Sequence, residues 1–291
     1  QKLTSLLLCV VLLVFAFFSQ SLQSLWLQFS SGETLVTLVA NGPRSTGSSW
    51  LEHRARVAIL FVHCVLPSMP FDKVEDEATA MATLDLTIIQ ELGLGLEKKG
   101  FCAVPPNDKT TTCLSDFKNA SHCIVWAPTD AKAYKEHRAR ALILMQFRVD
   151  GSLGFPGGYL NLGECPATAA NREMKEEINL DTSKLFVTPK DHLITFVNDH
   201  RKVALHLYSL QIGVEDFIEL ERRILDAPHY GRETLGFFRV PLFNMATGGF
   251  ETLLRQVFIG LAKEQLLYAL VRLGIMTSEE VMTVGCLKNE V

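Results

Sequence analysis

The sequence predicts an α/β fold in which helices cover a mixed sheet, and two observations lead to this expectation. From about residue 118 onward, short apolar runs of strand length alternate with amphipathic segments of helical period, and turn residues separate them. Before that point the punctuation is irregular, with a stretch rich in Ser, Gly and Thr. Alternating strands and helices are typical of a sheet covered by helices on its faces. We therefore expect an α/β/α sandwich over residues 116–288, preceded by an N-terminal extension over residues 1–115.

The extension carries a segment that resembles a secretory signal. Residues 6–18, "LLLCVVLLVFAFF", form an unbroken apolar run behind Lys2. The run is too short to span a bilayer as a helix but fits the apolar region of a signal peptide, and the alternatives are a mis-assigned upstream exon or a short buried helix. A formal glycosylation sequon, "NAS", starts at Asn119. Further along the extension, residues 72–92 are acidic and favour a helix, and a linker-like "PPNDKTTTC" follows.

The second part is predicted to contain a regular series of elements. Pro128 and Pro241 end two strand-like runs, and Gly274 ends a long amphipathic helix. "NDHR" is a hairpin turn between two alternating strands. The expected strands are 122–128, 141–147, 192–197, 202–212 and 234–243, and the expected helices are 167–178, 215–225 and 251–273.

Composition limits the functions that suit this chain. Of its 291 residues, 28 are Lys or Arg and 32 are Asp or Glu, so the formal net charge is −4. A protein held to nucleic acid by bulk electrostatics would be basic, so the balance argues against that class while leaving room for a local basic groove.

One stretch combines a glycine turn with an acidic helix. On the helix predicted after Pro166, Glu173, Glu176 and Glu177 fall at i, i+3 and i+4, so they share one face. An acidic face alone is usually solvated surface, but three close carboxylates also suit a hard divalent cation such as Mg²⁺ or Mn²⁺. Arg172 can hold one carboxylate by a bidentate contact.

The turn before the helix completes a pattern that fits diphosphate chemistry. Gly157 and Gly158 let the backbone approach a ligand or a metal closely. A metal held by the helix would neutralise phosphate oxygens and activate a water molecule. Together the residues read G-x5-E-x7-R-E-U-x-E-E-x-x-U, where U is apolar, and the positions are filled by Gly158, Glu164, Arg172, Glu173, Met174, Glu176, Glu177 and Leu180.

This pattern resembles the signature box of the Nudix hydrolases, with one departure. The box has Gly where this chain has Asn179, the residue that next best tolerates a left-handed helix end. The segments "ALILMQFRVDGSLGFPGG", "LGFFRVPLF" and "FIGLAKEQLLYALVRLGIM" are similar to the branch that removes caps from small nucleolar RNA and hydrolyses inosine diphosphates. The similarity covers roughly residues 118–287, and residues 1–115 resemble nothing in that family. The resemblance implies a Nudix-type α/β/α sandwich.

The resemblance also implies roles for individual residues. Glu173, Glu176 and Glu177 match metal-binding glutamates, and Gly157 matches a backbone metal contact; Arg172 would position the carboxylates. Glu233 falls where the family places a further carboxylate, which would bind a second metal or help to activate water. Contacts to the substrate match His122, Arg148, Phe155 and Gln265. His206, in an alternating strand, is expected to be structural.

The resulting hypothesis is a Mg²⁺- or Mn²⁺-dependent hydrolase that cleaves a phosphoanhydride in a capped RNA or in a deaminated purine nucleotide. The alternative is a catalytically weak RNA-binding or scaffold protein of the same branch, although all box glutamates are present here. We expect no stable membrane partner, and a homodimer is one option because compact domains of this family often pair. The family implies the nucleus (nucleolus and nucleoplasm) and cytoplasm, whereas a genuine signal peptide would imply secretion.

Overall fold

The structure, a computed structural model, describes residues 25–26, 39–40, 77–106 and 114–285. The chain divides into two compact units, residues 1–73 and 74–291. In the first unit, β1 (Leu25–Trp26) and β2 (Val39–Ala40) pair in antiparallel orientation. The apolar run at residues 6–18 lies outside the described residues. No helix within the described stretches has the length and apolar character needed to cross a membrane.

A mixed sheet forms the centre of the second unit, as predicted. Its strands run in the order β12-β7-β4-β11-β10-β3, and β8 and β9 add to β7 and β4. The pair β4 and β11 is parallel, while the other pairs are antiparallel. The strands are β3 (Cys102–Val104), β4 (Lys118–Pro128), β7 (Ala141–Arg148), β8 (Leu153–Gly154), β9 (Gly157–Tyr159), β10 (His192–Asn198), β11 (Val203–Gln211) and β12 (Thr234–Arg239).

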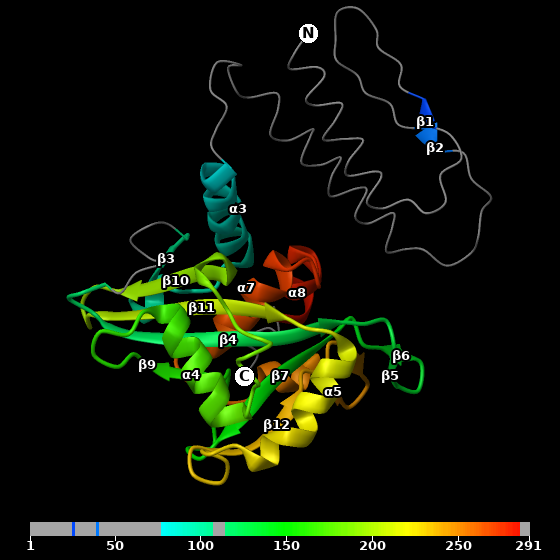
Figure 1. Cartoon of the computed structure of the whole chain (residues 1–291). Coiled ribbons are helices and arrows are strands. Elements are labelled where there is room, and N and C mark those ends of the chain that lie inside the picture. Colours follow the sequence, from blue (N-terminus) through cyan, green and yellow to red (C-terminus); the bar gives the residue numbers. More distant parts are fainter. Residues whose placement is uncertain (1–24, 27–38, 41–76, 107–113, 286–291) are drawn as a thin grey trace, which may run out of the picture. The chain divides into compact units, whose positions relative to one another are not determined.

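Helices cover both faces of this sheet and enclose two apolar cores. Figure 1 shows α4 and α5 on the near side of the sheet and α7 on the far side. Along β4, alternate side chains enter the two cores: Ile124 and Trp126 pack on the α7 side, while Cys123 and Val125 pack on the α4 side. The helices are α3 (Glu77–Leu92), α4 (Pro166–Ile178), α5 (Val214–Arg223), α6 (Phe250–Leu254), α7 (Ala262–Arg272) and α8 (Ser278–Gly285). The predicted α/β/α sandwich is therefore confirmed.

The long helix predicted over residues 251–273 is wrong, because two helices, α6 and α7, replace it. Between them the chain pairs with β8: Leu153 N–H donates to Val257 O at 2.8 Å, and Ile259 N–H donates to Leu153 O at 2.9 Å. Gly260 then takes a positive φ of 53°. Backbone hydrogen bonds to a strand thus replace those of a continuous helix, and the apolar period of the sequence does not reveal that competition.

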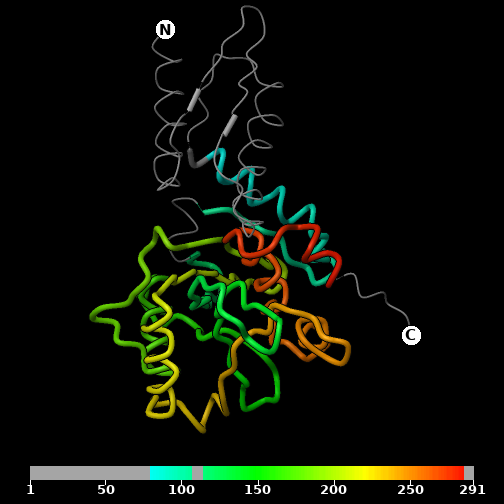
Figure 2. The backbone as a smooth tube through the Cα atoms, turned by 90° about the vertical axis from the view of Figure 1, so that its right-hand side faces the viewer, coloured from blue at the N-terminus to red at the C-terminus, as the bar shows by residue number. Residues whose placement is uncertain are grey.

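The division between the two units falls between Lys73 and Val74, not near residue 115 as predicted. Strand β3 pairs with β10 at the edge of the main sheet, and α3 lies along α7 and α8, the cyan and red segments of Figure 2. Asp85 of α3 is fully buried and accepts hydrogen bonds from Tyr268 Oη at 2.6 Å and Arg272 Nε at 2.5 Å. Residues 77–106 are therefore part of the sandwich itself.

We predict that Asp85→Ala lowers the free energy of unfolding by about 3–5 kcal/mol, because it leaves the largely buried Arg272 guanidinium without its carboxylate. Urea unfolding followed by circular dichroism measures the effect. Glu136→Ala is the matched control, because its pair with Lys132 is exposed and worth about 0–1 kcal/mol. Equal losses in the two variants would show that α3 does not stabilise the sandwich.

Candidate active site

The glycine turn lies against the acidic helix because neither glycine has room for a side chain. A Cβ on Gly157 would lie 2.2 Å from Ser121 O, and one on Gly158 would lie 2.6 Å from Glu173 Oε1. Gly157 also has a φ of 147°, which L side chains avoid. The close approach expected of these glycines is therefore to a neighbouring strand and to a box carboxylate.

Arg172 binds three of the glutamates around the turn. Its Nη1 donates to Glu173 Oε1 at 2.7 Å and to Glu176 Oε2 at 3.0 Å. Its Nε and Nη2 form a bidentate pair with Glu164, with both distances 3.0 Å. Nη2 also donates to Tyr159 O at 3.0 Å. All five N–H donors of the guanidinium are used, so Arg172 fixes the helix, the turn and the loop between them.

Glu177 occupies the buried side of the cluster. Its side chain is 1 % exposed, and its Oε2 accepts a hydrogen bond from Gly157 N–H at 2.8 Å. Burial raises the pKa of Glu177 to about 8. The Gly157 hydrogen bond lowers this pKa, and the charges of Glu173 and Glu233 add smaller increases. Burial also raises the pKa of Glu173. Negative charge is thus crowded at this point.

Gln146 is a site residue that the sequence reasoning missed. It is fully buried on β7, its Nε2 lies 2.9 Å from Phe155 O and 3.4 Å from Glu177 Oε2, and its Oε1 accepts from Thr234 Oγ1 at 2.6 Å. One side chain therefore joins the turn, the box helix and β12. The sequence feature that could have revealed Gln146 is its position in the apolar run "ALILMQF". An amide in such a run is expected to be buried, and a buried amide needs hydrogen-bond partners.

Glu233 lies beside the cluster. Burial is the main cause of the raised pKa of Glu173 and of Glu177, and the charge of Glu233 adds a smaller increase to both. The loop that carries it is tied to the box helix, because His229 N–H donates to Glu176 O at 3.0 Å. The structure therefore brings together the predicted carboxylates from two distant parts of the chain.

Asn179, the departure from the box, ends α4 in the left-handed conformation that was expected, with a φ of 53°. Its N–H donates to Met174 O, and its Nδ2 donates to Arg223 O at 3.1 Å. Glycine could supply the same backbone conformation but not the side-chain bond to the end of α5. The expectation of a tolerated left-handed end is confirmed.

Two further predicted residues lie on the opposite side of the sheet. His122 is half-buried and shares its face of β4 with Ile124, which packs on the α7 side. Gln265, on α7, is 2 % exposed. Within the described part of the chain, His122 Nδ1 and Gln265 Nε2 are both buried without a hydrogen-bond partner. Unpaired buried polar atoms are costly, so both atoms are able to bind a polar group of a ligand or a water molecule.

Arg148 lies close enough to His122 and to Glu177 for its charge to affect the pKa of each. Burial lowers the pKa of His122 to about 4, with Arg148 and His206 as smaller causes, so His122 is neutral at pH 7. The same guanidinium opposes the rise in the pKa of Glu177. Arg148 makes an ion pair with Asp150 at 3.4 Å.

The ring of Phe155 is not brought to the surface. It is 2 % exposed and belongs to the core under α7. Phe155 therefore acts on its surroundings through its carbonyl, which Gln146 holds, rather than through an accessible ring.

His206 is structural, as predicted, because its Nδ1 is hydrogen-bonded to Thr195 and its Nε2 to Asn119, both at 2.9 Å. Asn119, the sequon residue, is 5 % exposed, so the folded chain holds this amide inside.

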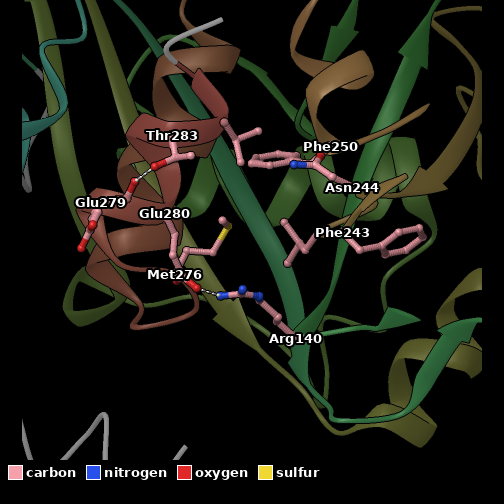
Figure 3. Close-up of a pocket in the computed structure, with 10 residues that line it drawn as sticks. Arg140, Phe243, Asn244, Phe250, Met276, Glu279, Glu280 and Thr283 are labelled. Atoms are coloured by element: carbon pink, nitrogen blue, oxygen red, sulfur yellow. Dashed lines mark hydrogen bonds and ion pairs between the residues drawn. The ribbon is translucent and has the colours of Figure 1, made fainter. Parts of the chain in front are cut away.

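A cavity of about 300 Å³ lies elsewhere, between α8 and the start of β7 (Figure 3). Its floor includes Phe250 and Met276, and Arg140 and Glu280 form an ion pair of 2.7 Å beside it. It contains none of the predicted site residues, so the carboxylate cluster, not this cavity, is the candidate active site.

The carboxylates do not converge on one point as they stand. In the described residues no group of three or more His, Cys, Asp or Glu side chains is arranged to hold a metal ion. Arg172 takes Glu173 and Glu176, and Gly157 N–H takes Glu177. The donors nevertheless fit a hard divalent cation, because they are carboxylate oxygens, which such ions prefer as ligands. Burial, with a smaller contribution from neighbouring carboxylates, raises the pKa of Glu173 and Glu177.

Comparison with known proteins shows which family the chain matches. Residues 119–276 match the family model described as "Nudt16-like: U8 snoRNA-decapping enzyme-like". The chain is 44 % identical over 137 residues to a U8 snoRNA-decapping enzyme of Homalodisca vitripennis, covering 46 % of this chain and 73 % of that relative. The mouse (Mus musculus) U8 snoRNA-decapping enzyme is 35 % identical over 164 residues, covering 55 % and 84 %.

Relatives of another kind also match. The Tudor-interacting repair regulator protein of Mus musculus is 32 % identical over 168 residues, which is 56 % of this chain and 78 % of that protein. Among solved structures, a MutT/nudix family protein from Listeria innocua aligns with a TM-score of 0.37 and 16 % identity, covering 54 % of this chain and 94 % of that one.

We predict a pH-dependent stability of the protein in the presence of a chelator. The pKa of Glu177 is raised in the fold from an ordinary 4.5 to about 8, so its contribution to stability is complete below pH 4.5 and is lost as the pH rises through 8. Relative to Glu177→Gln, the wild type should lose about 1.4 kcal/mol per pH unit across this window. Urea unfolding at several pH values measures the difference. Parallel stability curves for the two proteins would contradict the raised pKa.

Proposed function

The chain belongs to the Nudt16-like family of Nudix hydrolases, and on this premise we propose that it removes the cap from RNA, including small nucleolar RNA, and hydrolyses inosine or deoxyinosine diphosphate. The observation that carries the proposal is the buried Glu177 carboxylate, held under the glycine turn beside Glu173 and Glu176. The names of the two U8 snoRNA-decapping relatives support the cap as substrate.

Glu173, Glu176 and Glu177, with the backbone of Gly157, would hold Mg²⁺ or Mn²⁺. When bound, such an ion neutralises phosphate oxygens and lowers the pKa of a water molecule. Arg172 keeps the carboxylates on one side of the turn and so orders the cluster. Glu233, whose charge acts on two of these glutamates, would orient the attacking water or share in binding the metal.

His122 and Gln265 would recognise the nucleobase. Among the described residues Gln265 Nε2 is a buried donor without a partner, and a carbonyl oxygen is the acceptor that it fits. Guanine in a cap and hypoxanthine in inosine both present such an oxygen on their six-membered ring, so one donor suits both substrates. Neutral His122 can accept or donate a hydrogen bond beside it. Arg148, whose charge reaches both His122 and Glu177, would bind the phosphates.

The complete set of box glutamates favours an enzyme over a scaffold. The family relationship favours the nucleus, including nucleolus and nucleoplasm, with the cytoplasm as a further location, and pairing into a homodimer stays a prediction. Microscopy of the tagged full-length chain tests the location. Secretion into the medium would instead support a signal peptide at residues 6–18.

We predict that Glu177→Gln reduces hydrolysis of capped RNA and of inosine diphosphate by about 10²–10⁴-fold. The substitution removes a carboxylate that would bind the metal or accept a proton during the reaction. Product release with Mg²⁺ or Mn²⁺, measured by chromatography, checks the result. Glu279→Gln, an exposed glutamate of α8, is the control and should behave as wild type. Unchanged turnover by a folded Glu177→Gln protein would sink the metal assignment.

We also predict that Gln265→Leu raises KM for inosine diphosphate roughly tenfold, because the donor to the base oxygen is lost. Adenosine diphosphate has no such oxygen, so its hydrolysis should not weaken. Steady-state kinetics on both nucleotides provide the comparison. A similar loss for both would mean that Gln265 shapes the fold and does not read the base.

A further inference from the structure

We propose that a single strand of RNA, the part of the substrate beyond the cap, leaves the active site across a strip formed by Tyr159, Lys118, Phe117 and Lys202, here called the lysine–aromatic strip. The inference rests on the proposed decapping function and extends it from the cap to the body of the RNA. Lysine ammonium groups interleaved with aromatic rings are the combination that binds single-stranded nucleic acid with little sequence preference.

The first pair of the strip is Lys118 and Tyr159. Lys118 Nζ lies 3.8 Å from the centre of the Tyr159 ring, close enough for a cation–π contact. The tyrosine side chain is 52 % exposed, and Lys118 at the start of β4 is exposed as well. Within the described residues Lys118 makes no ion pair with a carboxylate. Its charge is therefore available to a phosphate.

The second pair is Lys202 and Phe117, with Nζ 5.0 Å from the ring centre. The two pairs are adjacent, because Lys118 N–H donates to Lys202 O at 2.7 Å. Lys202 also pairs with Asp199 at 2.6 Å, which neutralises part of its charge. Lys118 is therefore the stronger phosphate contact of the two.

The strip begins where the active site ends. Tyr159 follows Gly158, the residue against which the Glu173 carboxylate packs, and its carbonyl accepts from Arg172. Figure 1 shows β9, which ends at Tyr159, beside β4 and next to α4. A strand whose first phosphates lie at the box helix therefore meets Tyr159 and Lys118 next.

The strip is also held in place from below. Buried Asn119 donates to Leu114 O at 2.9 Å and to Phe117 O at 2.7 Å. It fixes the turn that carries Phe117 and Lys118, so binding RNA would cost little ordering of the backbone. The amide that reads as a glycosylation sequon thus acts as a support for this surface.

Polymer and nucleotide should respond differently to changes in the strip. A nucleoside diphosphate is confined to the carboxylates and the base-binding residues, whereas an RNA strand continues onto the strip. We expect Lys118→Ala to raise KM for capped RNA several-fold, up to about tenfold, while kcat/KM for inosine diphosphate stays the same.

The chain offers a matched control at a distance from the box. On the hairpin of β5 (Lys132–Tyr134) and β6 (His137–Arg138), Lys135 Nζ lies 5.2 Å from the ring of Tyr134, which is 51 % exposed. Lys135→Ala removes the same charge from a similar pair and should leave both substrates unaffected. An equal rise in KM for capped RNA in Lys118→Ala and Lys135→Ala would overturn the proposal.

A binding measurement separates the strip from catalysis. The full chain is titrated against a fluorescent, uncapped single-stranded RNA of about twelve nucleotides, and anisotropy is followed at several salt concentrations. Lys118→Ala should reduce the slope of log affinity against log salt by about 0.7, and Tyr159→Leu should weaken binding while Tyr134→Leu does not.

The two arms fail separately. If wild-type protein cleaves no capped RNA but binds the oligonucleotide through Lys118 and Tyr159, the decapping function is wrong and the strip stands as an RNA-binding surface. If capped RNA is cleaved and both variants bind and cleave it as wild type does, the strip is wrong and the decapping function stands. No RNA binding by the wild type also overturns the strip.

Discussion

The candidate site depends on one hydrogen bond, from the backbone N–H of Gly157 to the buried Glu177 carboxylate. It joins the turn after β8 to the box helix, which are otherwise separate segments of the chain. Gln146 reaches the same oxygen from β7 and is itself oriented by Thr234 of β12. The Glu177 carboxylate would be costly to bury without partners. It is bound by donors from the glycine turn and from β7, so its burial also holds these elements in place.

The cluster balances attraction against repulsion before any ligand binds. Arg172 uses all its donors on Glu164, Glu173, Glu176 and the Tyr159 carbonyl, while Glu177 is not among its partners and has a raised pKa. The negative charge of the glutamates is therefore only partly compensated, at the place where a cation that binds phosphate would lie. The glycines belong to the same arrangement, because a Cβ at Gly158 would lie 2.6 Å from Glu173 Oε1 and would displace that carboxylate. The contacts of Arg172 and of the glycine turn therefore both order the glutamate side chains and leave negative charge available to a cation.

The sequence predicted the sandwich, the box helix and the left-handed Asn179, because helical period, Pro166 and the spacing of the glutamates are local signals. The sequence did not predict the helix break before α7. That break comes from pairing with β8, a contact between residues about a hundred positions apart. The inclusion of α3 and β3 escaped for the same reason, and so did Gln146, whose partners lie on three other elements. Interactions between distant segments, rather than weak local patterns, account for each difference.

The two faces of the sheet carry different groups of candidate site residues. The carboxylates lie with α4 on one side, where the box helix packs through Met174, and His122 lies on the side that packs against α7 and carries Gln265. The box motif describes only the first side, so it specifies a phosphoanhydride and not the group attached to it. Under the proposed function, the group attached to the phosphoanhydride would be recognised on the second side and on surfaces that continue beyond the turn. Because β4 contributes His122 to one face and begins at Lys118 beside Tyr159, this single strand would connect the proposed recognition of the base to the proposed path of a longer substrate.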